Sequence, residues 1–158
     1  MKVESAPPPV VRVSGARLLI AAAPYYREVV GPLIEGAARA IAAAGGAHEV
    51  VEVPGAFELP AAILATESAQ CGFDGYVALG CVVRGETSHY DYVCGETARG
   101  IMELSLRGLE IGFGLLTVEN LDQARVRAAL DQGDKGGEAA RAALALIAYK
   151  RQIAGQSR

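Results

Sequence analysis

Residues 80–93 read G-C-V-V-R-G-E-T-S-H-Y-D-Y-V, and the rest of the chain can be interpreted outward from this stretch. It completes an apolar run that begins at Tyr76, which is typical of a strand buried on both faces. Small and polar residues follow at 84–88, and beyond them apolar residues recur at three- and four-residue steps, the spacing of one helix face. The hydroxyl of Thr87 or Ser88 is expected to cap that helix. The stretch therefore predicts a strand, a short turn and a helix.

The turn in this stretch has the features of an anion site. A strand followed by a capped helix leaves free backbone N–H groups and the positive end of a helix dipole at one spot. His89, one of two histidines in the chain, falls in the first turn of the predicted helix. A proton-transfer group beside an anion cradle indicates an active site. A tight strand-to-helix connection also needs small polar residues for structural reasons, so the local pattern fits both interpretations.

Strands and helices alternate along the rest of the chain. Apolar runs predict further strands at residues 18–23, 50–53 and 111–118. Helices are expected after each strand, with the last two at about 121–130 and 136–153. This alternation indicates a parallel sheet covered on both faces and joined by right-handed crossovers. The predicted fold class is α/β, a flavodoxin-like three-layer αβα sandwich with a four-stranded parallel sheet, in which ligands bind beyond the carboxyl ends of the strands.

The chain divides into a short arm and one domain. Residues 1–16, with three consecutive prolines at 7–9, cannot form a helix or a central strand, so they are expected to be an extended arm. Residues 17–158 are expected to fold as a single domain. A chain of 158 residues buries roughly 70% of its unfolded surface, which suffices for one core.

Composition excludes several classes of function. The net charge of −3 lacks the basic face that nucleic-acid binding requires. No apolar run reaches the roughly 18 residues that span a membrane, and the N-terminus lacks the apolar core of a signal peptide. The three cysteines have no metal-site or disulfide spacing and are expected to be reduced and mostly buried in a cytoplasmic protein. Two distant histidines predict no metal centre, and a hydrophobic share of 51% indicates burial between subunits.

Four blocks of sequence together resemble the lumazine synthase family. They are V-P-G-A-F-E-L-P at 53–60, the stretch at 80–93, G-L-L-T-V-E-N-L-D-Q-A at 114–124, and G-D-K-G-G-E-A-A at 133–140. The blocks occur in the family's order and at its spacing, and the resemblance runs from about residue 18 to about residue 153.

The resemblance implies an activity and an assembly. It implies condensation of 5-amino-6-(D-ribitylamino)uracil with 3,4-dihydroxy-2-butanone 4-phosphate to 6,7-dimethyl-8-ribityllumazine, in riboflavin biosynthesis. The sequence of Schiff-base formation, phosphate loss and ring closure includes no redox step, so no cofactor or metal is expected. The family forms five-membered rings with active sites between subunits, and a free pentamer is the expectation for this chain.

The resemblance also assigns residues to the ribitylaminouracil. Tyr25 stands where the family places an aromatic ring that stacks on the heterocycle, with Tyr26 as the alternative. Glu58 would accept hydrogen bonds from the ribityl hydroxyls. The remaining residues that would line this part of the pocket are Ala56, Phe57, Cys81, Val82, Val83 and Phe113.

The resemblance assigns a second group of residues to the phosphate-bearing substrate. The resemblance implies that Arg127 makes the main contact with the phosphate and that Lys135 adds a point charge. Backbone N–H groups and a hydroxyl at Gly85, Glu86 and Thr87 would complete the cradle. His89, beside it, would move the protons that each step requires.

Two other interpretations remain. A family member could have kept the ring pocket as a flavin- or lumazine-binding protein without turnover, although Arg127, Lys135 and His89 are all present. A flavodoxin-like binding or signalling module would be expected to carry a phosphate loop or an acidic cluster after the first strand, where this chain has Pro24-Tyr25-Tyr26.

Overall fold

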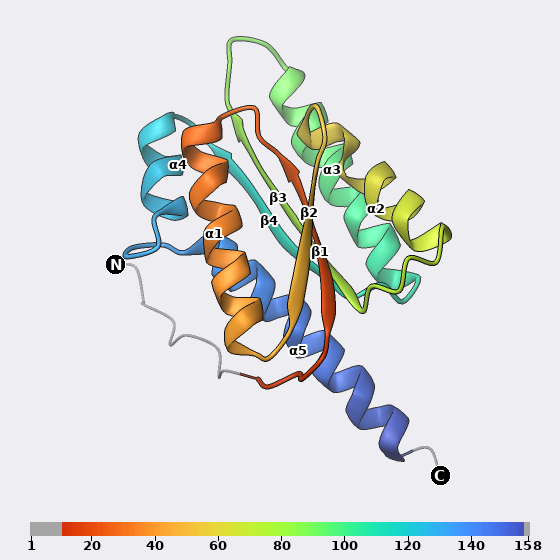
Figure 1. Ribbon diagram of the computed structural model, residues 1–158. Coiled ribbons are helices and arrows are strands. Elements are labelled where there is room, and N and C mark those ends of the chain that lie inside the picture. The colour runs from red at the N-terminus through yellow and green to blue at the C-terminus, as the bar shows by residue number, and fades with distance from the viewer. Residues whose placement is uncertain (1–10, 157–158) are drawn as a thin grey trace.

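The computed structural model describes residues 11–156, and its helices and strands alternate as predicted (Figure 1). The strands are β1 (Arg17–Ala23), β2 (Ala47–Glu52), β3 (Gly75–Val83) and β4 (Ile111–Val118). The helices are α1 (Arg27–Ala43), the short 3₁₀ turn η1 (Ala56–Glu58), α2 (Leu59–Ser68), α3 (His89–Leu106), α4 (Leu121–Ala128) and α5 (Lys135–Gln156).

The four strands form one sheet in the order β2-β1-β3-β4, and every neighbouring pair is parallel. The chain therefore runs from β1 to β2 on one side of β1, and then crosses back to β3 on the other side of β1. The order reverses between β1 and β3, the position at which open parallel sheets bind ligands. The predicted α/β fold with a four-stranded parallel sheet is confirmed.

Alternate residues of β1 supply two separate cores, because successive side chains of a strand point to opposite faces. Leu18, Ile20 and Ala22 pack in the cluster that includes α1, α4 and α5. Leu19, Ala21 and Ala23 pack in the cluster with α2 and α3. Figure 1 shows these two groups of helices on opposite faces of the sheet. Burying one such Leu or Ile contributes roughly 1.5–3 kcal/mol, so both faces stabilise the layered arrangement.

The edge strand β2 differs from its prediction. It begins at Ala47, three residues before the expected start at residue 50, and most of it is exposed. Among the described residues it pairs with β1 alone, with Leu18 beside His48 and Ala22 beside Glu52. A strand at an edge needs no continuous apolar run, and for this reason the sequence pattern showed only its second half.

One side-chain expectation is corrected, and a second is decided between its two alternatives. Cys71 is exposed, whereas Cys81 is buried and Cys94 is half-buried, so the cysteines are not mostly buried. Ser88 makes no side-chain cap at the start of α3; the hydroxyl of Thr87 instead accepts a hydrogen bond from the His89 N–H at 3.3 Å.

The predicted arm is described only in its last part. Residues 1–10 lie outside the described residues, and residues 11–16 contain no helix or strand. Val13 and Ala16 are nevertheless buried against the α1 side of the sheet, and the Val13 N–H donates to the Ala44 carbonyl at 2.8 Å. This part of the chain is therefore packed against the domain.

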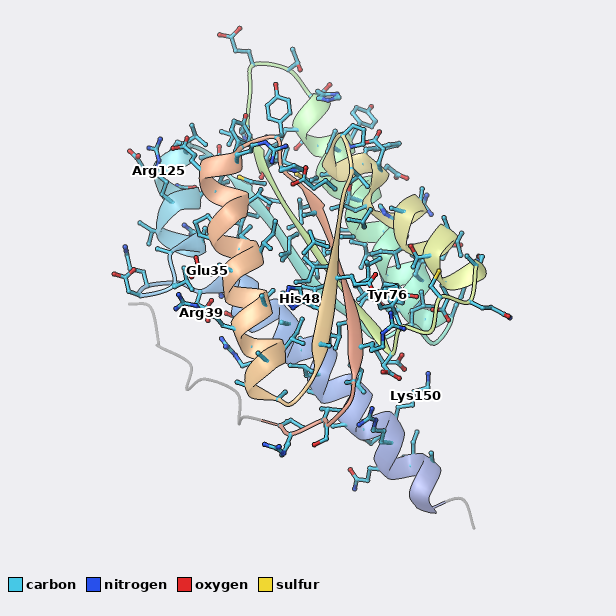
Figure 2. All side chains as sticks on the ribbon, viewed as in Figure 1. Glu35, Arg39, His48, Tyr76, Arg125 and Lys150 are labelled. Atoms are coloured by element: carbon cyan, nitrogen blue, oxygen red, sulfur yellow. The ribbon has the colours of Figure 1, made fainter. Side chains whose placement is uncertain are left out.

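Surface ion pairs join neighbouring elements. Arg125 binds Glu28 at 3.1 Å and links α4 to α1, while Lys150 binds Glu110 at 3.1 Å and links α5 to the start of β4. Figure 2 shows Arg125 and Lys150 at opposite ends of the molecule. An exposed pair such as Arg125–Glu28 contributes at most about 1 kcal/mol, whereas the Glu110 side chain is only 13% exposed. Within residues 11–156, no helix is both long enough and apolar enough to cross a membrane.

Candidate active site

A hollow of about 650 Å³ lies at the carboxyl ends of β1 and β3, where the strand order reverses. The loops that follow β1, β2 and β3 all lie at this end of the sheet (Figure 1). Eight residues singled out from the sequence line the hollow: Tyr25, Ala56, Phe57, Glu58, Cys81, Val82, Val83 and His89.

Several aromatic rings line this hollow. Tyr25 is 75% exposed and Phe57 is 57% exposed. Tyr26 also lines the hollow, but it is partly buried against the α1 side of the core and contacts the Tyr25 ring edge-on, with centroids 4.9 Å apart. Of the two tyrosines, Tyr25 thus has the more exposed ring, and the ring of Tyr26 packs against it.

Glu58 supplies the carboxylate of the hollow. It is the last residue of η1, and its Oε2 would lie 3.1 Å from a Cβ added at Gly55, so a glycine there lets the carboxylate approach the backbone. Within the described residues it has no side-chain hydrogen bond or ion pair. An exposed carboxylate that has no partner can accept hydrogen bonds from the hydroxyls of a ligand.

The end of β3 forms the floor of the hollow. Cys81 is 5% exposed, and burial, with a smaller contribution from nearby Cys94, raises the pKa of its thiol to about 11. At neutral pH the thiol is therefore protonated. A buried, protonated thiol is a poor nucleophile, so Cys81 acts as an apolar wall.

Arg84 is the main side-chain anchor of the loop that leads to His89, the first residue of α3. The Arg84 Nε donates to both Glu119 oxygens at 3.1 and 3.0 Å, and its NH1 reaches Asp91 at 3.3 Å. Its guanidinium also lies 4.2 Å from the centroid of the Tyr90 ring. These contacts tie the end of β3 to the end of β4 and to the first turn of α3. They hold the exposed loop that leads to His89.

A second hollow, of about 330 Å³, lies along β4, the edge strand farthest from β2. Phe113 from β4, Arg127 from α4 and Lys135 from α5 line it. The Arg127 NH1 donates to the Gln123 carbonyl at 2.9 Å, and the Lys135 Nζ lies 2.6 Å from the Glu138 carboxylate. Two cations and an aromatic ring beside one another can bind a phosphate next to a flat ring.

Glycines on both sides of Phe113 bring α5 against β4. A Cβ at Gly112 would lie 1.9 Å from the Ala139 carbonyl oxygen of α5, and a Cβ at Gly114 would lie 3.0 Å from the Ala139 Cβ and 2.4 Å from the Leu79 side chain of the neighbouring strand β3. Larger residues would push the helix away from the strand. Phe113 itself is 47% exposed, so its ring is available at the second hollow.

The predicted site residues thus fall into two separate groups. The two hollows share no lining residue. Gly85, Glu86 and Thr87 line neither; they lie on the exposed loop between β3 and α3, next to His89. One chain therefore presents the predicted residues in two separate hollows.

Some lining residues were missed in the sequence. Tyr92 and Val93 line the first hollow, three and four residues after His89 on α3, and Glu138 lines the second, three residues after Lys135 on α5. That spacing puts them on the same helix face as the predicted residues, and it could have identified them.

Comparisons with known proteins agree on one family. The family model described as 6,7-dimethyl-8-ribityllumazine synthase matches residues 15–151. A protein of that name from Sphingopyxis alaskensis is 54% identical over 139 residues, covering 87% of this chain and 97% of the relative. The protein of that name from Novosphingobium aromaticivorans is 52% identical to this chain over 135 residues, which covers 85% of this chain and 96% of the relative. The one from Afipia carboxidovorans is 46% identical over 147 residues, which covers 90% of this chain and 90% of the relative. The chain belongs to the 6,7-dimethyl-8-ribityllumazine synthase family.

Proposed function

We propose that this protein condenses 5-amino-6-(D-ribitylamino)uracil with 3,4-dihydroxy-2-butanone 4-phosphate and releases 6,7-dimethyl-8-ribityllumazine, phosphate and water, a step of riboflavin biosynthesis. The observation that carries the proposal is the family match over residues 15–151, together with relatives that the chain covers almost completely. We place the reaction in the cytoplasm, where free thiols such as that of Cys81 stay reduced.

The active site, in this proposal, forms between two neighbouring subunits of a homopentameric ring. The two hollows on one chain support this arrangement, because each holds a different part of the expected site. A ring uses a heterologous contact, so each subunit gives one half-site to each of its two neighbours. Exposed apolar side chains beside the hollows, including Phe57, Tyr92 and Phe113, would be covered by this contact.

The first hollow binds the ribitylaminouracil in the proposed complex. Tyr25 stacks on the heterocycle, and Phe113 of the neighbouring subunit closes the opposite side of the ring. Backbone at Ala56 and Phe57 meets the ring edge, and the unpaired Glu58 carboxylate accepts from the ribityl hydroxyls. Cys81, Val82 and Val83 form the wall behind it.

The second substrate is held by its phosphate. Arg127 offers a planar fork of N–H groups, Lys135 adds a positive charge, and Gly85, Glu86 and Thr87 of the facing subunit contribute backbone N–H groups and a hydroxyl. The Glu86 carboxylate would repel a phosphate dianion, so only its backbone helps. Holding both substrates in reacting geometry supplies a large part of the rate enhancement.

His89 transfers protons in this mechanism. The substrate amine attacks the ketone and loses protons while the carbonyl oxygen leaves as water, which forms the Schiff base. Phosphate then leaves, the product tautomerises, and attack of the second nitrogen closes the ring with loss of water. Each of these steps moves a proton near the loop of Gly85, Glu86 and Thr87, and His89 follows that loop in the first turn of α3. General acid–base assistance of this kind contributes roughly 10²–10⁴-fold.

Turnover with both substrates tests the proposal. The purified protein, mixed with the two substrates, should produce lumazine absorbance and release inorganic phosphate in step with it. A protein that binds the lumazine tightly but never forms it would instead be a binding protein that has kept the ring pocket.

A further inference from the structure

The turn that joins α4 to α5 fixes the two cations of the second hollow relative to each other. The Gly133 N–H donates to the Val126 carbonyl at 3.0 Å, and the Asp134 N–H donates to the Ala129 carbonyl at 2.9 Å. A Cβ at Gly133 would lie 2.6 Å from the Arg127 Cα and carbonyl oxygen, so the turn packs directly on the backbone of Arg127. Lys135 follows at once as the first residue of α5.

Asp134 is the centre of this turn. Its φ is +42°, in the left-handed region that Asp tolerates better than most residues. Its Oδ1 accepts from the Gly137 N–H at 3.2 Å, and its carbonyl accepts from the Glu138 N–H at 2.9 Å. Its Oδ2 accepts from the Arg141 NH2 at 3.2 Å. Asp134 thus caps the first turn of α5 and, through Arg141, also binds the next turn of that helix.

Glycines from two helices leave the space that the Asp134 carboxylate fills. A Cβ at Gly36 of α1 would lie 2.3 Å from Oδ1, and a Cβ at Gly137 would lie 2.2 Å from Oδ2. The side chains of Asp134 and Arg141 are each 26% exposed, and no other ion pair within residues 11–156 has both partners this buried. The carboxylate therefore occupies a fitted socket between α1 and α5.

We infer that Asp134 is a positioning residue for the phosphate site, which holds Lys135 in place relative to Arg127. The inference rests on the proposed function, which assigns the phosphate to these two cations. A carboxylate beside a phosphate site would by its charge alone weaken anion binding. Its presence in a fitted socket, paired with Arg141, indicates that it acts through geometry, by fixing the first turn of α5, from which Lys135 reaches the hollow.

Three substitutions separate geometry from charge. Asp134→Gly keeps the positive φ without steric strain but removes the cap and the ion pair. Asp134→Asn keeps an oxygen for the Gly137 N–H but puts an amide NH2 in place of the oxygen that accepts from Arg141, so it keeps the cap and removes the ion pair. Asp131→Gly is the matched control: it removes the same charge from the same turn, and Asp131 is exposed, with no hydrogen bond or ion pair among the described residues.

The kinetic expectation is selective for the phosphate-bearing substrate. Asp134→Gly should raise the KM for the butanone phosphate, and the inhibition constant of inorganic phosphate, by about tenfold. The KM for the ribitylaminouracil should change by less than about twofold, because its half-site lies elsewhere. Asp134→Asn should recover most of the loss, and Asp131→Gly should match the wild type or bind phosphate slightly better.

A double-mutant cycle with Lys135→Ala decides whether Asp134 acts through Lys135. In the Lys135→Ala background, Asp134→Gly should change the phosphate constants by less than about twofold. An equal effect in both backgrounds, or an equal effect on both substrates, would overturn the inference.

If Asp134→Gly does not assemble, Arg141→Met, which leaves the cap in place, takes its part in the cycle. Arg141→Met should raise the same phosphate constants about threefold, and this effect should disappear in the Lys135→Ala background. Wild type that makes no lumazine would overturn the proposed function and this inference with it, whereas active wild type with an additive cycle would overturn the inference alone.

Discussion

The Nε of Arg84 donates to both carboxylate oxygens of Glu119, at 3.1 and 3.0 Å, and so joins the end of β3 to the end of β4. Arg84→Lys retains the charge but cannot reproduce this fork and the contact with Asp91 together. The loop that leads to His89 should then loosen, and kcat should fall roughly three- to tenfold. All three side chains are exposed, so the free energy of unfolding should change by less than about 1 kcal/mol.

Arg99→Lys is the control for that variant. Arg99 also binds two carboxylates, Glu96 and Glu103, but it lies further along α3 and lines neither hollow. Equal losses of kcat in the two variants would show that Arg84 has no special role at the loop.

Arg127→Ala should impair use of the butanone phosphate far more than binding of the ribitylaminouracil. Losing a charge-assisted contact with the phosphate should cost roughly 1.5–3 kcal/mol, measured from kcat/KM for each substrate. Arg125→Ala is the matched control, because Arg125 lies two residues earlier on α4 and pairs with Glu28 and Asp122 instead of lining the hollow. A folded Arg127→Ala protein with equal losses for both substrates would contradict the phosphate role.

His89→Ala should slow turnover while the Kd of a lumazine-like ligand stays nearly unchanged. An appreciable rate should remain, because the substrates are still held together without the imidazole. The control is His48→Ala, on the edge strand β2 (Figure 2), where an exposed histidine lines neither hollow. Loss of ligand binding in a folded His89→Ala protein would mean that His89 is structural.

Thiol alkylation should distinguish the cysteines and follow pH. At pH 8 the exposed Cys71 should be labelled well before Cys81. Burial raises the pKa of Cys81 from an ordinary value of 9.0 to about 11, so its reactive thiolate forms only as pH rises through that range. The rate of Cys81 labelling, followed by peptide mass spectrometry, should keep increasing from pH 9 to 11. Rapid labelling at pH 8 in the folded protein would contradict the burial argument.

Local pattern predicted some elements of the fold better than others. The bounds of β4 match the prediction although it is an edge strand, because most of its residues are buried. β2 was placed three residues late because Ala47, His48 and Glu49 are exposed and leave no apolar signature. They pair with β1 through the backbone and through the ion pair between Glu49 and Arg17. The choice between Thr87 and Ser88 as the cap depended on the loop's path, which Arg84 fixes through contacts with another strand.

The site was predicted from the four sequence blocks more than from local chemistry. The spacing around His89 indicated an anion cradle, but only the resemblance joined it to Arg127 and Lys135. The socket around Asp134 was not foreseen, because Gly36 and Gly137 are about a hundred positions apart and meet only when α1 packs on α5. Contacts of this kind follow from helix packing and leave no periodic signal.

The central claim is that each active site is shared between two subunits, and mixing two inactive variants tests it most directly. His89→Ala damages one half-site of a chain and Arg127→Ala damages the other. If the two variants are unfolded together and reassembled in equal amounts, random mixing should place both intact halves at roughly one interface in four. Activity should then rise to about a quarter of wild type per site. Mixed assemblies that contain both chains by mass, yet stay as inactive as the parent variants, would contradict the shared site.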